Sequence, residues 1–263
     1  MKNTYKPQLQ VRSAQLGGGA YLLCVPLVSA TREQLIADAR AALAYRPDLL
    51  EWRADYQTCY PQPAPIAETL ATLRQIAGDT PILFTSRHAA EDGAQAISEE
   101  EKFRLLDEVS RTGMADLVDI ELRYGDARIT QWKERWSGTG LRLIVSAHNF
   151  KRGWRPERIQ DILRKEQQAG ADIVKLVTRV KHVRELAELA EAIQEARETF
   201  LRVPVIAGVV GSLSPMMRMM GDRLGSDLTF VSAGAGKSHA SQLHIDDLRR
   251  LRGHLEAPSS APR

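Results

Sequence analysis

Eight short apolar segments, each followed by a longer stretch with helical periodicity, constrain the fold of this 263-residue chain most strongly. Most of the segments are rich in Val, Ile and Leu, and they lie at Tyr21–Leu27, Asp48–Trp52, Pro81–Thr85, Leu117–Glu121, Leu141–Ser146, Ile173–Val177, Val203–Ala207 and Leu228–Ser232. Near-continuous apolar character is typical of parallel strands that are buried on both faces. Eight strand–helix repeats predict an α/β fold, a (β/α)8 TIM barrel, with an open doubly wound sheet as the alternative.

The stretches between these segments carry helix start signals. Thr31 is a suitable N-cap for a helix that runs to about Tyr45. Ser98, followed by Glu101, forms the pattern of a capping box, in which each residue bonds the other's backbone N–H. Pro156 stands where a first helical turn should begin, because proline needs no hydrogen bond there. These signals place helices in the intervals that a barrel requires.

The two ends of the chain have their own patterns. Residues 8–20 precede the first barrel strand, and they read as a β-hairpin that closes the N-terminal end, the bottom, of the barrel. The sequence contains no linker that would divide two domains, so residues 1–255 are expected to form one catalytic domain. Residues 256–263 are rich in Pro, Ser and Ala and are expected to be a disordered tail.

Composition excludes several classes of function. The net charge is only +3 with 26% charged residues, and the basic residues are dispersed along the helices, which argues against a nucleic-acid partner. No apolar run reaches the roughly 18 residues that span a membrane, and the N-terminus resembles no signal peptide, so a cytoplasmic location is expected. Cys24 and Cys59 form no metal-binding spacing and are expected to be free thiols, and no metal or cofactor is expected.

Lys175 is the most unusual residue of the sixth apolar segment. It lies between Ile173 and Val177, on the same face of the predicted strand. Burial of an ammonium group lowers its pKa, and the neutral amine that results is a nucleophile towards carbonyl groups. A lysine that reaches solvent from the strand end, paired with a neighbour, is the alternative. Its companions decide between the two.

His148 ends the preceding segment and supplies such a companion. It shares one face of the strand with Ser146, because successive side chains of a strand alternate. A single histidine is more often structural than catalytic, but one at the mouth of a barrel, one strand from a buried lysine, is suited to proton transfer near neutral pH.

Polar side chains also end three other segments. Active sites of TIM barrels lie at the carboxyl ends of the strands, so these side chains should meet there. They are Glu51, Arg53 and Asp55 at or just after the end of the second segment, Arg87 and Glu91 after the third, and Asp119 and Glu121 in the fourth. Any one of them could form a salt bridge within the barrel. Together with the fifth segment, which ends near His148, however, four adjacent strands end in polar side chains, and this is more than a purely structural barrel needs.

These motifs resemble type I 3-dehydroquinate dehydratase, the imine-forming enzyme of the shikimate pathway. The resemblance runs from about Tyr21 to Arg249. Its landmarks are Glu51-Trp52-Arg53, Thr85-Ser86-Arg87 with Glu91, Asp119-Ile120-Glu121, Ser146-Ala147-His148-Asn149-Phe150, the strand with Lys175, and Arg218.

The resemblance implies roles for individual residues. Lys175 would form an imine with the C3 ketone of 3-dehydroquinate, His148 would move protons, and Glu91 would orient His148. The implied substrate-binding residues are Glu51, Arg53 and Arg87 for the ring hydroxyls, Arg218 for the carboxylate, and Ser238 and Gln242 in a closing loop. The family further implies a homodimer that serves aromatic biosynthesis or quinate breakdown.

The chain departs from the family pattern at several places. Ala147 and Asn149 replace an aromatic residue and an aspartate beside the histidine, and the closing loop reads Ser238-His239-Ala240-Ser241-Gln242. These changes affect substrate grip more than the type of reaction. Two other functions therefore remain as alternatives: a class I aldolase with its lysine on the sixth strand, and a non-catalytic barrel that senses a quinate-like metabolite.

Overall fold

The fold is a nearly closed barrel of eight parallel strands, seen in a computed structural model that describes residues 7–234 and 240–256. The barrel strands are β3 (Leu22–Leu27), β4 (Leu49–Arg53), β5 (Ile82–Thr85), β6 (Leu117–Glu121), β7 (Arg142–Asn149), β8 (Ile173–Arg179), β9 (Val205–Val210) and β10 (Leu228–Phe230). They pair in the order β10-β3-β4-β5-β6-β7-β8-β9. Between β9 and β10, Asp227 closes the ring: its N–H donates to the Val205 carbonyl at 2.7 Å, and its carboxylate accepts from the Val205 N–H at 2.8 Å. The predicted barrel is confirmed, and the open sheet is wrong.

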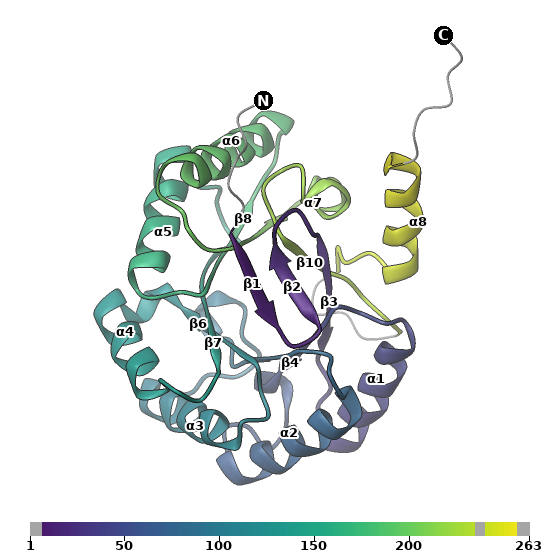
Figure 1. Cartoon of the computed structure of the whole chain (residues 1–263), viewed down its shortest axis with the longest axis vertical. Helices are drawn as coiled ribbons and strands as arrows, with labels where there is room; N and C mark the ends of the chain where they lie inside the picture. The colour runs from purple at the N-terminus through teal and green to yellow at the C-terminus, as the bar shows by residue number, and fades with distance from the viewer. Residues whose placement is uncertain (1–6, 235–239, 257–263) are drawn as a thin grey trace.

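Helices surround the barrel (Figure 1). They are α1 (Arg32–Ala44), α2 (Pro63–Ala77), α3 (Glu99–Thr112), α4 (Asp126–Arg135), α5 (Pro156–Gln168), α6 (Val183–Thr199), α7 (Ser214–Met220) and α8 (Ile245–Glu256), with 3-10 turns η1 (Ala54–Tyr56), η2 (Ala89–Glu91) and η3 (Leu122–Tyr124). The predicted helix starts are confirmed. Thr31 caps α1, Ser98 and Glu101 form both bonds of the capping box of α3, and Pro156 opens α5.

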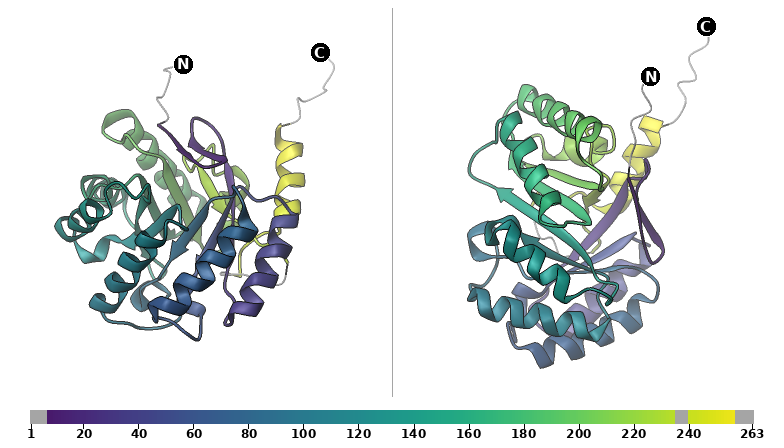
Figure 2. Two further views of the ribbon diagram at one scale, coloured as in Figure 1. Left: turned by 60° about the horizontal axis from the view of Figure 1, so that its bottom comes forward. Right: turned by 60° about the vertical axis from the view of Figure 1, so that its left-hand side comes forward.

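A β-hairpin covers one end of the barrel, as the sequence predicted. Strands β1 (Gln8–Val11) and β2 (Ala14–Gly17) are antiparallel and lie across the ring of strands (Figures 1 and 2). Leu16 of the hairpin is completely buried. It belongs to a small core that contains the first inward residues of several strands, including Leu49 and Ile173. Because those residues begin their strands, the hairpin closes the N-terminal end and leaves the carboxyl ends for the site.

Strands β7 and β8 extend beyond their predicted ends, by three and two residues respectively. The ladder pairs Ser146 with Lys175 and His148 with Val177. His148 therefore lies on the strand next to Lys175, two positions further towards the carboxyl end, and its side chain emerges on the same face.

Other expectations concern the chain's cysteines, helices and C-terminus. Cys24 and Cys59 are both free thiols. Of the helices that the structure describes, none has both the length and the apolar composition to cross a membrane. Glu256 is the last residue of α8, and the rest of the predicted tail, 257–263, lies outside the described residues.

Candidate active site

Lys175 lies inside the barrel near the carboxyl end of β8, and only 4% of its surface is exposed. Its Nζ atom is 2.8 Å from Oδ2 of Asp119 and 4.0 Å from Oε1 of Glu51. The ring of Phe230 lies against it, with the ring centroid 4.7 Å from Nζ. Two carboxylates and an aromatic face compensate the desolvation of one positive charge. The lysine does not reach solvent, so that part of the alternative is wrong, whereas the pairing with a neighbour that it expected is present.

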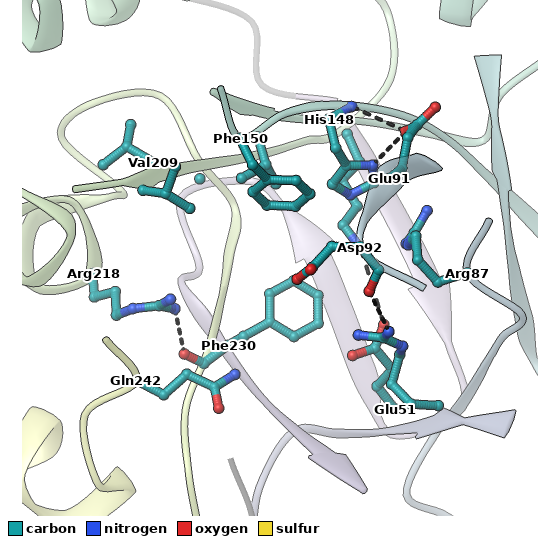
Figure 3. Close-up of a pocket in the computed structure, with 15 residues that line it drawn as sticks. Glu51, Arg87, Glu91, Asp92, His148, Phe150, Val209, Arg218, Phe230 and Gln242 are labelled. Carbon is teal, nitrogen blue, oxygen red and sulfur yellow. Dashed lines mark hydrogen bonds and ion pairs between the residues drawn. The ribbon is translucent and has the colours of Figure 1, made fainter. Parts of the chain in front are cut away.

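His148 and Glu91 form a second pair at the mouth of the barrel (Figure 3). Glu91 ends the turn η2, and its Oε2 atom accepts from the His148 backbone N–H at 3.2 Å. The same oxygen lies 2.9 Å from Nδ1 of His148. A proton on Nδ1 satisfies this contact, and Nε2 is then the atom that can exchange a proton with a ligand.

Burial sets the protonation of this pair. It holds the pKa of His148 well below its ordinary value, and the positive charges of Arg87 and Lys175 act in the same direction. Burial, together with the charge of Glu121, raises the pKa of Glu91 to about 7. His148 is thus a neutral imidazole that can take a proton, beside a carboxyl group that titrates near neutrality.

Arg87 is at the centre of a buried network of ion pairs. Its two terminal nitrogens lie 2.9 and 2.8 Å from the two carboxylate oxygens of Asp119, and one of them is 2.9 Å from Glu121. Lys102 of α3, also buried, binds the other oxygen of Glu121. Burial would raise the pKa of Asp119, but the charges of Arg87 and Lys175 outweigh it and hold that pKa well below the usual range. The network thus keeps Asp119 ionised beside Lys175.

Glu51 and Arg53 lie on β4, four strands from β8 in the eight-stranded order and thus across the barrel from Lys175. Oε1 of Glu51 accepts from the Thr85 hydroxyl at 2.8 Å. Arg53 pairs with Asp55 through two bonds of 2.9 and 2.8 Å, and it also donates to the Asp92 carbonyl at 3.2 Å. The sequence pattern allowed either a mutual pair or a grip on substrate hydroxyls. The pair with Asp55 forms, and Arg53 still lines the pocket.

Arg218 lies across the pocket from Glu91 and Arg87 (Figure 3). Its guanidinium donates to the carbonyl oxygens of Phe230 at 2.6 Å and Ser241 at 3.1 Å. Within residues 7–234 and 240–256 it has no carboxylate partner, and burial lowers its pKa to about 10, at which it remains charged at neutral pH. A cation held in place by neutral groups is suited to a carboxylate ligand.

One pocket of about 110 Å³ brings these groups together. Its lining contains eight of the nine residues to which the resemblance gives a role, namely Lys175, His148, Glu91, Glu51, Arg53, Arg87, Arg218 and Gln242. The ninth, Ser238, lies outside the described residues. Arg87 faces the pocket with most of its donors already bound inside the protein, which the sequence did not indicate.

Several lining residues were not proposed from the sequence. They are Asp92, Phe150, Val177, Gly208, Val209, Val210 and Phe230. Phe150, Val210 and Phe230 end or directly follow their strands, where the rule that located the polar residues would also have located them. The others lie within the second half of β8 or β9, or, for Asp92, directly after η2. The residues that the structure describes contain no cluster of three His, Cys, Asp or Glu side chains placed to hold a metal ion.

Comparison with known proteins agrees with this geometry. The family model for type I 3-dehydroquinase matches residues 23–257, which is most of the chain. The chain belongs to the type I 3-dehydroquinase family. The resemblance seen in the sequence is thereby confirmed, and the chain is an enzyme of the hydro-lyase class.

Relatives and solved structures cover nearly the whole protein. The 3-dehydroquinate dehydratase of Geobacillus sp. (strain WCH70) is 34% identical over 244 residues, which is 92% of this chain and 93% of the relative. The crystal structure of 3-dehydroquinate dehydratase from Geobacillus kaustophilus HTA426 has a TM-score of 0.90 at 33% identity, covering 96% of this chain and 97% of that one. A type I enzyme from Clostridium difficile, determined with covalently modified comenic acid, has a TM-score of 0.89 at 29% identity, over 95% and 98% of the two chains. Membership of this family leaves the aldolase and sensor alternatives without support.

Proposed function

We propose that this enzyme eliminates water from 3-dehydroquinate to give 3-dehydroshikimate, through an imine on Lys175. The observation that carries the proposal is the joint placement of Lys175 and the His148–Glu91 pair in one pocket, with the charged Arg218 opposite. An amine, a proton-transfer pair and a carboxylate-binding cation are the groups that dehydration of a carboxylated hydroxyketone requires.

The first step joins the substrate to Lys175. After its ammonium loses a proton, Nζ attacks the C3 carbonyl carbon, and the resulting carbinolamine loses water to form the protonated imine. The positive charge then lies where the ammonium charge lay, 2.8 Å from Asp119. The carboxylate that neutralises the resting lysine therefore also stabilises the iminium ion, without rearrangement of the site.

His148 carries the elimination. Its Nε2 atom takes the C2 proton, and the electrons of that C–H bond move into the iminium to give an enamine. The enamine expels the C1 hydroxyl, which leaves as water with the proton from His148. Hydrolysis of the remaining imine consumes one water and frees Lys175 and 3-dehydroshikimate. Glu91, bound to Nδ1, holds the imidazole in the orientation that both transfers need.

The remaining polar residues would position the substrate. Arg218 would bind the C1 carboxylate, and Glu51, Arg53 and Arg87 the ring hydroxyls, with Gln242 and Ser238 closing the site. Phe150 and Phe230 line the pocket between these groups (Figure 3), and their side chains would cover the faces of the substrate ring.

The cellular setting belongs to the same proposal. We propose a cytoplasmic homodimer, with residues 1–255 as one catalytic domain, that needs no dissociable cofactor and serves the shikimate pathway to aromatic amino acids or the breakdown of quinate. Both routes use the same dehydration.

Incubation of the protein with 3-dehydroquinate tests the reaction. The conjugated enone of the product absorbs in the ultraviolet and the substrate does not, so absorbance should grow in proportion to enzyme. The variant Lys175→Ala should show no growth above the uncatalysed rate. Absence of turnover by the unaltered protein would contradict the proposed function.

A further inference from the structure

A second cavity, of about 470 Å³, lies on the outer side of the His148–Glu91 pair. His148 and Glu91 line both this cavity and the active-site pocket. The other walls come from η3, the start of α4, and α5, which lies beside α4 (Figure 1). The proton-transfer pair is thus a partition between two cavities, of which the proposed reaction uses one.

The walls of the second cavity are predominantly cationic. Besides Glu91, its charged residues are Arg123, Arg158, Lys165 and a single acid, Asp126. Arg123 makes its hydrogen bond to Nδ1 of His88, at 3.0 Å, and no ion pair of Arg123 occurs in the described part of the chain. Arg158 and Lys165 share one carboxylate, that of Asp161. The positive charge around the cavity is therefore incompletely neutralised.

Apolar residues complete the lining. The indole of Trp154 is half-buried, and with Leu122 and Ile162 it forms an apolar wall beside the cations. A pocket with one apolar wall and several cations is suited to a small ligand that carries an oxyanion, either a phosphate or a carboxylate.

We propose that this second cavity is a regulatory site for a small oxyanion, which acts on the enzyme through the His148–Glu91 pair. Arg123 is the connection, because its positive charge lowers the pKa of Glu91 and a bound anion would offset that charge. The other charged groups that face Glu91 are Glu121, Asp119, Arg87 and the imidazole of His148, and of these only His148 lines the second cavity. With the anion bound, the His148–Glu91 pair therefore keeps its proton on Glu91 up to a higher pH. Because proton transfer needs the deprotonated pair, the enzyme slows near neutral pH.

Inorganic phosphate is the probe. Calorimetric titration of the unaltered protein should show binding, and the double variant Arg158→Gln/Lys165→Gln should weaken it at least tenfold while leaving activity without phosphate unchanged at a pH above the acid limb of the kcat profile. The matched control Lys181→Gln/Arg184→Gln removes two exposed cations near the start of α6, which do not line the cavity, and should bind phosphate as the unaltered protein does. Equal binding by both double variants would overturn the site.

The kinetic arm rests on the proposed dehydratase activity, whereas the calorimetric arm does not. Saturating phosphate should shift the acid limb of the pH profile of kcat to higher pH by roughly 0.3 to 1 pH unit. This is the effect on the pKa of Glu91 that a unit charge has from about 10 Å away. Arg123→Gln should move it in the same direction without phosphate. If phosphate raises only KM, equally in the Arg158→Gln/Lys165→Gln variant, then it binds at Arg218 and the proposal is wrong.

Discussion

Nζ of Lys175 lies 2.8 Å from Oδ2 of Asp119, and Asp119 is completely buried. The same carboxylate also accepts two hydrogen bonds from Arg87 and one from the Ser146 hydroxyl at 2.5 Å. One acid thus balances Lys175, the residue proposed to form the imine, and a buried arginine. The charge at Asp119 should matter for catalysis and for folding alike.

Asp119→Asn tests this dependence. The variant leaves two buried cations short of one negative charge, so we expect a loss of about 3–5 kcal/mol in the free energy of unfolding. We also expect kcat to fall by roughly 10² or more, because the iminium ion loses its counter-charge. Denaturant titration and steady-state kinetics measure the two effects.

Asp116→Asn is the matched control. Asp116 precedes β6 at the opposite end of the barrel, where it binds Arg74 at 2.6 Å and the Ile82 N–H at 2.8 Å. This variant should lose stability while keeping kcat. If Asp116→Asn lost as much kcat as Asp119→Asn, then the loss of barrel stability alone would explain the lower kcat of both variants.

His148→Ala separates imine formation from elimination. Lys175 and Asp119 are untouched, so the imine should still form, whereas proton transfer should slow by about 10² to 10⁴. Rapid-quench trapping compared with steady-state turnover distinguishes the two steps. Turnover at the normal rate would refute the role of His148.

Arg218→Lys tests the proposal that Arg218 binds the substrate carboxylate. Lysine keeps the charge but loses the planar pair of donors, so we expect KM to rise by roughly 10-fold with a smaller change in kcat. Arg252→Lys is a suitable control, since Arg252 binds Asp222 outside the pocket. An unchanged KM for Arg218→Lys would remove Arg218 from the substrate-binding set.

Glu166 of α5 gives a prediction about stability and pH. It is completely buried, its Oε2 accepts from the Lys175 N–H at 3.2 Å, and its Oε1 has no partner among the described residues. Burial raises its pKa well above the ordinary value of 4.5. The folded protein then holds a proton that the unfolded chain releases, so Glu166 should lower stability increasingly as pH rises above about 4.5.

Glu166→Gln removes this titration and keeps an acceptor for the Lys175 N–H. We expect the variant to be more stable than the unaltered protein at pH 8, by about 1–3 kcal/mol, and to show no such difference at pH 4. Thermal unfolding at both pH values is the measurement. If Glu166→Gln were less stable than the unaltered protein at pH 8, the claim that buried Glu166 lowers stability at high pH would be wrong.

The sequence predicted the barrel and most of its site because both depend on local patterns. Apolar runs located the eight strands, and the rule that barrel sites lie at strand ends then brought Lys175 and His148 together. The hairpin was predicted for residues 8–20, which precede the first barrel strand, and β1 and β2 form it.

Pairings across the barrel could not be predicted in this way. The sequence offered both Glu51 and Asp119 as carboxylates, and nothing local decides which one accepts a hydrogen bond from Lys175. Lys102 is a further example: lysine in an amphipathic helix usually lies on the exposed face, yet it is buried against Glu121. Glu166 is likewise buried within a helix of mainly polar composition. These positions depend on how the barrel closes.

Reductive trapping tests the imine on Lys175 most directly. The protein is incubated with 3-dehydroquinate, reduced with borohydride, digested and examined by mass spectrometry. We predict a stable adduct on the peptide that contains Lys175, and none in the Lys175→Ala variant or without substrate. An unaltered protein that turns over 3-dehydroquinate but yields no adduct at Lys175 would contradict the mechanism.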